Sequence, residues 1–403
     1  MKLQRLLSLT RQAVDTYHMI DSGDHIAVGI SGGKDSLTLL YALANLRRFY
    51  PQPFSLSAIT VDLGFGNMDL EPVKALCSRF SVPYRIIPTE IGKIIFEARK
   101  ESNPCSLCAS ETARFIASQV PGAVYIPNQG GCAASAADIE MTFKVLSGFA
   151  ANPNVYGTVV IGNSCEGVQA PVLVERIKAL TNKPLESIVI REVGGTIKAV
   201  ELGVKYAMKM SMDASMCVRE EADISELILA TECGGSDPTS GLAANPTLGY
   251  VSDKLVGMGA TSILSETTEL MGTEDILAAR CIDERVAKDL LDMIKNNEEH
   301  FALAGENIRD GNPSPGNKEG GLTTIEEKSL GCINKAGYST INEVYGYGEQ
   351  VDKKGLVVMD TPGQDIASIA AMVAGGAQIV IFTTGRGTPT GNGIVPVIKI
   401  NGN

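Results

Sequence analysis

One group of residues with the types and spacing to do chemistry lies near the start of the chain, between a short apolar run and a helical pattern. It consists of Ser31, Gly32, Gly33, Lys34, Asp35 and Ser36. Glycines let a backbone fold tightly around an anion, and the N–H groups and dipole of a following helix favour negative charge there. We therefore expect a phosphate-binding loop. The alternative is an ordinary Gly-rich turn, and the spacing does not fit the Walker pattern.

A second chemical pattern recurs five times after residue 110. An apolar run ends in a loop of Cys, Glu, Asp, Ser and Gly, and a helical pattern usually follows. These stretches are 157–167, 226–241, 260–272, 355–365 and 377–391. If the five apolar runs are strands of one parallel sheet, their polar ends gather on one edge, where α/β enzymes bind ligands. The alternative is that these loops are polar only because loops generally are.

Cysteines stand in four of the glycine-containing loops. Together with Glu166, we predict them as metal ligands: Cys132, Cys165, Cys233 and Cys332. Taken singly, each is more often a small buried residue. Three or four meeting at one edge would suit iron or an iron–sulfur cluster.

The stretch 310–332 is the most unusual in the chain, with two prolines and five glycines among distinct polar side chains. Asn312, Asn317 and Lys318 could clamp a polyhydroxy acid, with lysine for a carboxylate and amides for hydroxyls. Glu326, Glu327 and Lys328 are predicted to start a helix. A flexible linker is the alternative, although linkers rarely carry so many distinct side chains.

The elements that must position these residues are readable from apolar patterning. Strands are expected at 25–30, 54–66 and 83–89, and helices at 37–49 and 69–80, the latter capped by Asp69. Helices are also expected near 248–258 and over 273–297. This alternation predicts an α/β fold with parallel sheets: an incomplete, Rossmann-like segment over 1–108, then one or two α/β domains over 109–403, divided near 220.

Composition limits the classes of protein. At 403 residues with 44% hydrophobic residues, the chain can build two or three cores, and no apolar run reaches membrane-spanning length. Nine cysteines without a secretion signal suggest a reducing cytoplasm. Residues 1–108 hold 12 Lys and Arg against 10 Asp and Glu, whereas the remainder holds 23 against 36. An acidic second part argues against a large nucleic-acid footprint there.

The early loop resembles the PP-loop of ATP pyrophosphatases. With Pro-Cys-x-x-Cys following at 104–108, the segment resembles tRNA 2-thiocytidine synthetase. The resemblance implies that the loop binds the pyrophosphate of ATP, with magnesium, and that Asp62 lies near the nucleotide. It also implies that Cys105 and Cys108 help to hold a 4Fe-4S cluster and that tRNA is the partner.

The stretches 232–249, 264–272, 312–332 and 382–403 resemble the altronate/galactarate dehydratase family, from about Ser110 to the last residue. The resemblance implies a sugar-acid substrate, a divalent metal, commonly iron, and loss of water from a hydroxy acid. Both family patterns are cut short, so we expect a fusion of two incomplete families. A natural fusion, a gene-assembly error and an artificial chimera all fit.

Water loss from a dihydroxy acid needs a base, a cation that stabilises the enediolate, and help for the departing hydroxide. With only three histidines, the base should be Lys328 or Glu266. The other residues expected at the site are Asn317, Lys318, Glu232, Ser236, Asp237 and Glu269. Each could instead be a solvated loop residue.

Three functions are compatible with these patterns. The first is a metal-dependent sugar-acid dehydratase that carries a truncated ATP-binding segment. The second is an ATP-dependent, iron–sulfur tRNA-thiolating enzyme, and the third is an inactive hybrid. We expect a cytoplasmic protein that does not bind a membrane and that can form a homo-oligomer. The charge distribution favours the dehydratase among the three functions.

Overall fold

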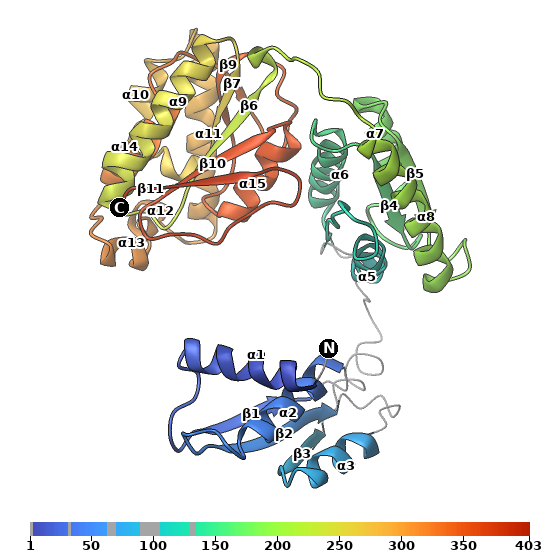
Figure 1. Ribbon diagram of the computed structural model, residues 1–403. Coiled ribbons are helices and arrows are strands. Elements are labelled where there is room, and N and C mark those ends of the chain that lie inside the picture. The colour runs from blue at the N-terminus through green and yellow to red at the C-terminus, as the bar shows by residue number, and fades with distance from the viewer. Residues whose placement is uncertain (1–2, 31–33, 63–69, 89–104, 129–133) are drawn as a thin grey trace. The chain divides into compact units, whose positions relative to one another are not determined.

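The computed structural model describes residues 3–30, 34–62, 70–88, 105–128 and 134–403, and for 34, 35 and 105–108 it describes only the backbone. The chain forms two compact units, Met1–Asn103 and Pro104–Asn403 (Figure 1). Every strand pair is parallel, which confirms the α/β class. None of the described helices is long and apolar enough to cross a membrane.

The first unit is a three-stranded sheet with helices. Its elements are α1 (Leu3–Thr16), β1 (His25–Gly29), α2 (Lys34–Leu46), β2 (Ser55–Asp62), α3 (Glu71–Arg79) and β3 (Tyr84–Pro88). The strand order is β1-β2-β3, because β2 pairs with both neighbours. The predicted strands and helices are confirmed here. The predicted cap of the second helix is wrong, since α3 begins after Leu70, and Asp69 lies outside the described residues.

The second unit begins with a small α/β domain, in which the described residues form two strands and four helices. Its elements are α5 (Cys105–Ala117), α6 (Ala136–Ala151), β4 (Thr158–Gly162), α7 (Ala170–Leu180), β5 (Leu185–Val189) and α8 (Thr196–Ser215). Val160 packs with residues of α6 and α7, whereas Val159 and Ile161 pack with α5 and α8. Because alternate side chains of a strand point to opposite faces, helices cover both faces of this sheet.

The rest of the second unit is built on a six-stranded sheet of order β11-β10-β6-β7-β9-β8. Its strands are β6 (Ile228–Cys233), β7 (Thr261–Leu264), β8 (Ile341–Tyr345), β9 (Gly355–Met359), β10 (Ile379–Thr384) and β11 (Val397–Asn401). Its α-helices are α9 (Asn245–Gly257), α10 (Glu274–Ala278), α11 (Glu284–Leu303), α12 (Ile308–Gly311), α13 (Pro315–Glu319), α14 (Ile325–Ile333) and α15 (Asp365–Ala374).

Two apolar clusters hold this sheet between helical layers. Leu356 and Val358 of β9 pack with α11 and α14, whereas Val357 and Met359 pack with α15. All five residues of β9 are buried, which is the pattern of a parallel strand covered on both faces. A ligand site must therefore lie at the ends of the strands, because helices cover both faces of the sheet.

Two expectations from the sequence are wrong. The five polar strand ends do not share one sheet, because among the described residues β4 pairs with β5 alone, and the other four strands belong to the six-stranded sheet. The helix expected over 273–297 is two helices, α10 and α11, since Asp283 accepts a hydrogen bond from the N–H of Val286 and starts a new helix. The stretch 310–332 contains α13 and all but the last residue of α14, so it is not a flexible linker.

Asn152 joins the small domain to the six-stranded sheet. Its side-chain amide is buried and donates to the carbonyls of Val373 and Ala377, both at 2.8 Å. We predict that Asn152→Ala lowers the free energy of unfolding by about 1–3 kcal/mol, because two buried hydrogen bonds are lost, although the carbonyl of Val373 keeps the one from the N–H of Gly376. Urea denaturation measures this. Asn154→Ala, which removes a more exposed amide, is the control, and equal losses in the two variants would contradict the prediction.

Candidate functional site

Four loops meet at the carboxyl ends of the central strands. Cys233 ends β6, Glu266 follows β7, Thr361 follows β9, and Gly385 follows β10. Parallel neighbours place these ends on one edge, as expected from the sequence for these four strands. Beside this edge is a cavity of about 640 Å³, lined by residues of the four loops and of the 310–332 stretch.

A buried group of two thiols and two carboxylates lies at this edge. Cys233, Glu266, Glu269 and Cys332 each place one ligand atom within 4.8 Å of the others. The sulfur of Cys233 lies 3.4 Å from a Glu269 oxygen, 3.7 Å from a Glu266 oxygen and 3.9 Å from the sulfur of Cys332. Cys233 and Glu269 also line the cavity, so the group is reachable from it.

The backbone of Glu266 is held in an unusual conformation. Its φ is 68°, in the left-handed region that non-glycine residues rarely adopt. The hydroxyl of Thr361 accepts a hydrogen bond from the N–H of Glu266 at 2.7 Å, and the carbonyl of Thr361 accepts one from the N–H of Thr267. The loop after β9 thus fixes the turn that aims the Glu266 carboxylate at Cys233, and such strain is common at functional sites.

Lys335 supplies positive charge inside this group. Its side chain is fully buried, forms an ion pair with Glu266 and lies 3.3 Å from the sulfur of Cys233. Burial alone would lower the pKa of Lys335, but the negative groups around it, Cys233 first among them, raise the pKa well above its usual range. Burial raises the pKa of Glu266 to about 7, against the effect of the Lys335 ammonium.

Glu232 is a further buried acid beside the group. One oxygen accepts hydrogen bonds from Ser368 at 2.6 Å and Ser265 at 3.2 Å, and the other has no hydrogen-bond partner among the described residues. Burial, with the charge of Glu266, raises the pKa of Glu232 well above its usual range. An unpartnered, fully buried carboxyl oxygen is the kind of atom that an additional ligand would satisfy.

Lys328 is the lysine that faces the cavity. Its ammonium lies 2.5 Å from Glu269 and donates to the side-chain oxygen of Asn312 at 2.8 Å. Burial lowers its pKa, but the attraction to Glu269 outweighs burial, and the net pKa is raised. The cavity also contains Asp365 and Arg386, so its walls carry two acids and two bases.

The remaining predicted residues lie in three kinds of place. Ser236 and Asn317 line the cavity, and the Asn317 amide donates to the Ser236 carbonyl at 2.9 Å. Asp237 is buried and accepts from Thr239 and Ser240, so it shapes the loop after β6. Lys318 is exposed and is not among the residues that line the cavity. Its role as a carboxylate partner stays a prediction.

The predicted metal ligands are only partly brought together. Cys165 and Glu166 follow β4 in the small domain, where the Glu166 carboxylate accepts from the N–H groups of Asn163 and Cys165. They do not belong to the group around Cys233. Cys132 lies outside the described residues, as do the side chains of Cys105 and Cys108, at the start of α5.

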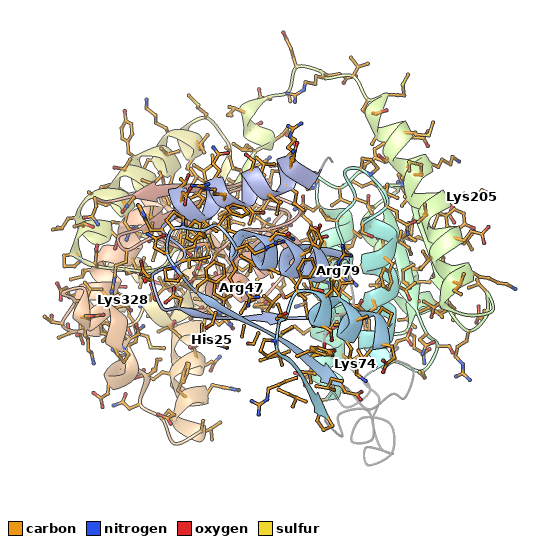
Figure 2. The ribbon with its side chains drawn as sticks, turned by 60° about the horizontal axis from the view of Figure 1, so that its bottom comes forward. His25, Arg47, Lys74, Arg79, Lys205 and Lys328 are labelled. Carbon is orange, nitrogen blue, oxygen red and sulfur yellow. The ribbon has the colours of Figure 1, made fainter. Side chains whose placement is uncertain are left out.

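The phosphate-binding loop of the first unit is described only in part. Ser31, Gly32 and Gly33 lie outside the described residues, and for Lys34 and Asp35 only the backbone is described. The helix α2 begins at Lys34, close after β1, and Ser36 lies in its first turn. Asp62 ends the neighbouring strand β2. His25, labelled in Figure 2, is hydrogen-bonded to Ser55 and Ser57 across the β1–β2 pair.

The sequence interpretation missed Lys335 and Thr361. Lys335 lies three residues after Cys332, at a spacing that places neighbours on one side of a helical turn. That spacing was a usable signal, since a lysine beside a ligand-type cysteine can compensate buried negative charge. Thr361 gave no signal, because only the fold brings the loop after β9 against the loop after β7.

The fold and the buried thiol–carboxylate group define an α/β protein with a candidate ligand site at the carboxyl ends of parallel strands. Residues 224–403 match the family described as D-galactarate/Altronate dehydratase, C-terminal. Residues 103–215 match D-galactarate dehydratase/Altronate hydrolase, second domain. The chain belongs to this family.

Curated relatives agree with this assignment. The chain is 38% identical over 275 residues to an altronate dehydratase of Bacillus subtilis, which covers 68% of this chain and 54% of the relative. It is 35% identical over 305 residues to the (2R)-sulfolactate sulfo-lyase subunit beta of Chromohalobacter salexigens, covering 74% and 77%. The chain spans about half the length of the altronate and galactarate dehydratases that it matches.

The first unit is similar to a different enzyme. Over 107 residues the chain is 40% identical to a tRNA-cytidine(32) 2-sulfurtransferase of Pelobacter propionicus, which covers 26% of this chain and 40% of that relative. This likeness and the dehydratase likeness lie on different parts of the chain, which supports the expected fusion.

The buried pair of Lys335 and Glu266 gives a test of the site's stability. We predict that Lys335→Met lowers the free energy of unfolding by about 3–5 kcal/mol, because it leaves buried negative charge uncompensated. Since burial raises the pKa of Glu266, the folded variant binds a proton more tightly than the unfolded chain does. Its stability should therefore fall as the pH rises from about 5 to 8.

Denaturant titration at several pH values measures both effects. The double variant Lys335→Met with Glu266→Gln should regain most of the lost stability and lose the added pH dependence, because the carboxylate that Lys335 pairs with is then replaced by a neutral amide. Lys295→Met, which removes an exposed lysine of α11, is the control. A loss no greater than that of the control would refute the compensating role of Lys335.

Proposed function

We propose that the second unit is a metal-dependent hydro-lyase that removes water from a sugar acid of the altronate or galactarate type. The observation that carries the proposal is the buried group of Cys233, Glu266, Glu269 and Cys332 beside a cavity of about 640 Å³. The relatives named altronate dehydratase and galactarate dehydratase support the reaction class.

The donor set fits a divalent transition metal. Thiolates favour softer ions and carboxylates favour harder ones, and a mixed set is compatible with ferrous iron. Glu232, with its unpartnered oxygen, is a further donor beside the four. Iron held by these residues would supply positive charge for the enediolate and for the departing hydroxide.

The charge of the cavity is a second reason for a bound cation. Lys328 is paired with Glu269, and Arg386 with Glu319, so both cationic side chains of the cavity wall already have partners. Glu269 and Asp365 balance them in number. An anionic substrate therefore needs more positive charge than these side chains offer.

We propose Lys328 as the residue that moves the proton from the carbon beside the carboxylate. Of the two predicted bases, it lines the cavity, whereas Glu266 is fully buried and is not part of the lining. Lys328 must first release a proton of its own, and its ion pair with Glu269 at 2.5 Å opposes this release as long as the carboxylate is not shared with a metal ion. Asn312 orients the ammonium from the other side, and Asn317 holds the loop of Ser236.

The proposal is tested by assaying altronate and galactarate with ferrous iron under anaerobic conditions. Lys328→Met should lower kcat by about 10²–10⁴-fold, the usual contribution of a positioned acid or base. Cys233→Ala should instead lower the iron content, measured by mass spectrometry of the metal. Lys295→Met, on an exposed face, should leave both unchanged. Full turnover by Lys328→Met at unchanged iron content would exclude its proposed role.

The first unit gives a separate proposal, binding of ATP with magnesium. It is supported by the strand–loop–helix arrangement of β1 and α2 and by the likeness to tRNA-cytidine 2-sulfurtransferases. A 4Fe-4S cluster at Cys105 and Cys108, which start α5 in the second unit, and tRNA binding by the first unit remain proposals that rest on the same likeness.

We predict weak ATP binding in calorimetry that Lys34→Ala reduces, because the lysine supplies positive charge to the phosphates. Lys74→Ala, which removes an exposed lysine of α3, is the control (Figure 2). The same Lys34→Ala protein should turn over sugar acid at the unchanged rate without ATP. Turnover that requires ATP would contradict the independence of the two units.

A further inference from the structure

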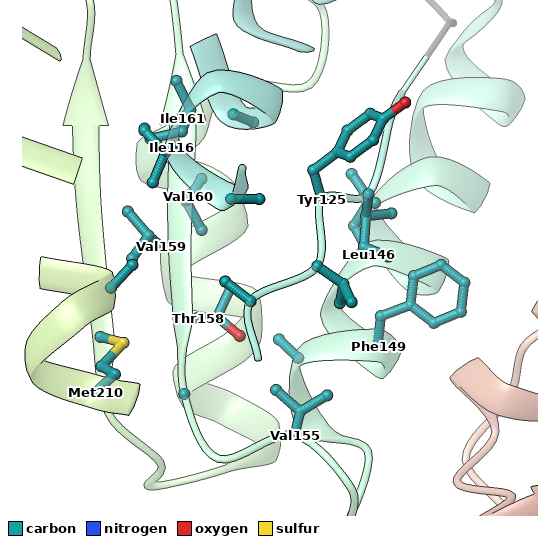
Figure 3. A pocket seen from close by; sticks show the side chains of 18 of the residues that line it. Ile116, Tyr125, Leu146, Phe149, Val155, Thr158, Val159, Val160, Ile161 and Met210 are labelled. Carbon is teal, nitrogen blue, oxygen red and sulfur yellow. The ribbon is translucent and has the colours of Figure 1, made fainter. Parts of the chain in front are cut away.

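A second cavity of about 630 Å³ lies mainly in the small domain, with Gly393 and Ile394 of the larger domain also in its wall (Figure 3). Its wall is mostly apolar, with Ile116 of α5, Leu146 and Phe149 of α6, and Met210 of α8 among its side chains. Four consecutive residues of β4, Thr158 to Ile161, also line it. Because consecutive residues of a strand point to opposite faces, a cavity that meets all four runs along the edge of the strand.

The hydrogen-bond pattern shows that this edge of β4 is unpaired. The N–H of Thr158 donates to the carbonyl of Pro184, and the carbonyl of Gly162 accepts from the N–H of Ile190. Alternate residues of a parallel strand bond to opposite sides, so Val159 and Ile161 direct their N–H and carbonyl groups away from β5. Among the described residues, β4 has no second partner strand.

The helices around the edge leave room for a strand. In this domain α5 and α6 cover opposite faces of the sheet, and both also line the cavity beyond β4. The segment 122–128, which belongs to no helix or strand, also lines the cavity and carries Tyr125 (Figure 3). The space therefore lies in the plane of the sheet, between two helical layers, where the next strand of a three-layer α/β domain would stand.

We propose that this cavity binds an extended, uncharged peptide strand of a partner chain, which pairs with Val159 and Ile161 as a third strand of the sheet. The unpaired backbone groups require a ligand with alternating donors and acceptors along one side, which an extended peptide has. The apolar helices above and below require β-branched or aromatic side chains on both faces of that strand. Addition of a strand to a sheet edge is a common way to recognise a peptide.

A small apolar molecule would fit this chemistry less well. It would leave the N–H and carbonyl groups of Val159 and Ile161 without partners in a space from which it had displaced water, and each such buried group is costly. A charged peptide would place its charge between apolar helices. The inference does not depend on the proposed function, because no residue of the thiol–carboxylate group lines this cavity.

The experiment uses the full chain and a fluorescein-labelled peptide of sequence Lys-Ser-Val-Thr-Val-Ile-Val-Ser-Lys, in which the seven central residues form the uncharged strand and the terminal lysines only keep the peptide in solution. Saturable binding in fluorescence anisotropy is expected, together with slower hydrogen exchange at the amides of Val159 and Ile161. The substitution Ile161→Pro removes the N–H that points to the cavity and leaves the bonds to β5 intact, so it should weaken binding by about tenfold or more. Ile161→Val, which keeps the N–H, is the matched control.

Peptides with N-methyl groups on alternate residues keep the test independent of the folding of Ile161→Pro. One of the two alternating patterns should abolish binding. Binding that tolerates both patterns would show that backbone pairing is not involved and would overturn the proposal. So would amides of Val159 and Ile161 that are already protected in the free chain, since the segment 122–128 or a second copy would then occupy the edge. Sedimentation velocity distinguishes those two occupants.

Discussion

The compensation of buried charge by Lys335 is the interaction on which the site depends. Three carboxylates and two thiols lie within or beside one buried group. The backbone at the ends of the strands carries no full positive charge that could neutralise them. The fully buried ammonium contacts both Glu266 and Cys233. Without it, the desolvation of several acids would oppose the approach of the loops after β6 and β7. One ammonium group cannot neutralise all of these acids, and the remaining negative charge would attract a metal ion.

The sheet positions this group because the carboxyl ends of four parallel strands lie side by side. Helices cover both faces, so the strands are buried and the loops carry all the polar chemistry. The strained turn at Glu266 is tolerated because the loop after β9 bonds it twice through Thr361. The stretch 310–332 then covers the edge with short helices and brings Asn312 and Lys328 to the cavity. Rigid strands thus support a wall that is made of loops.

In the small domain, by contrast, the side of one strand is left unpaired. Its sheet has two strands, and the free edge of β4 faces an apolar space between helices. A sheet edge normally is covered or carries charged residues that prevent pairing. Here neither protection is present at β4 among the described residues, because the lining there is apolar. Asn152, directly after α6, joins the two domains by donating to the carbonyls of Val373 in α15 and of Ala377 before β10.

The sequence by itself determined the α/β class, the parallel strands and several of the residues that the structure brings together at the candidate site. Apolar runs that end in polar loops are local patterns, so Glu232, Cys233, Glu266 and Glu269 could be predicted from them. Only the tertiary structure decided which loops meet. It separated β4 with Cys165 and Glu166 from the other strand ends, and it brought Lys335 and Thr361 to Glu266. The reason is that strand order and helix packing depend on contacts between residues far apart in the chain, which local patterns do not encode.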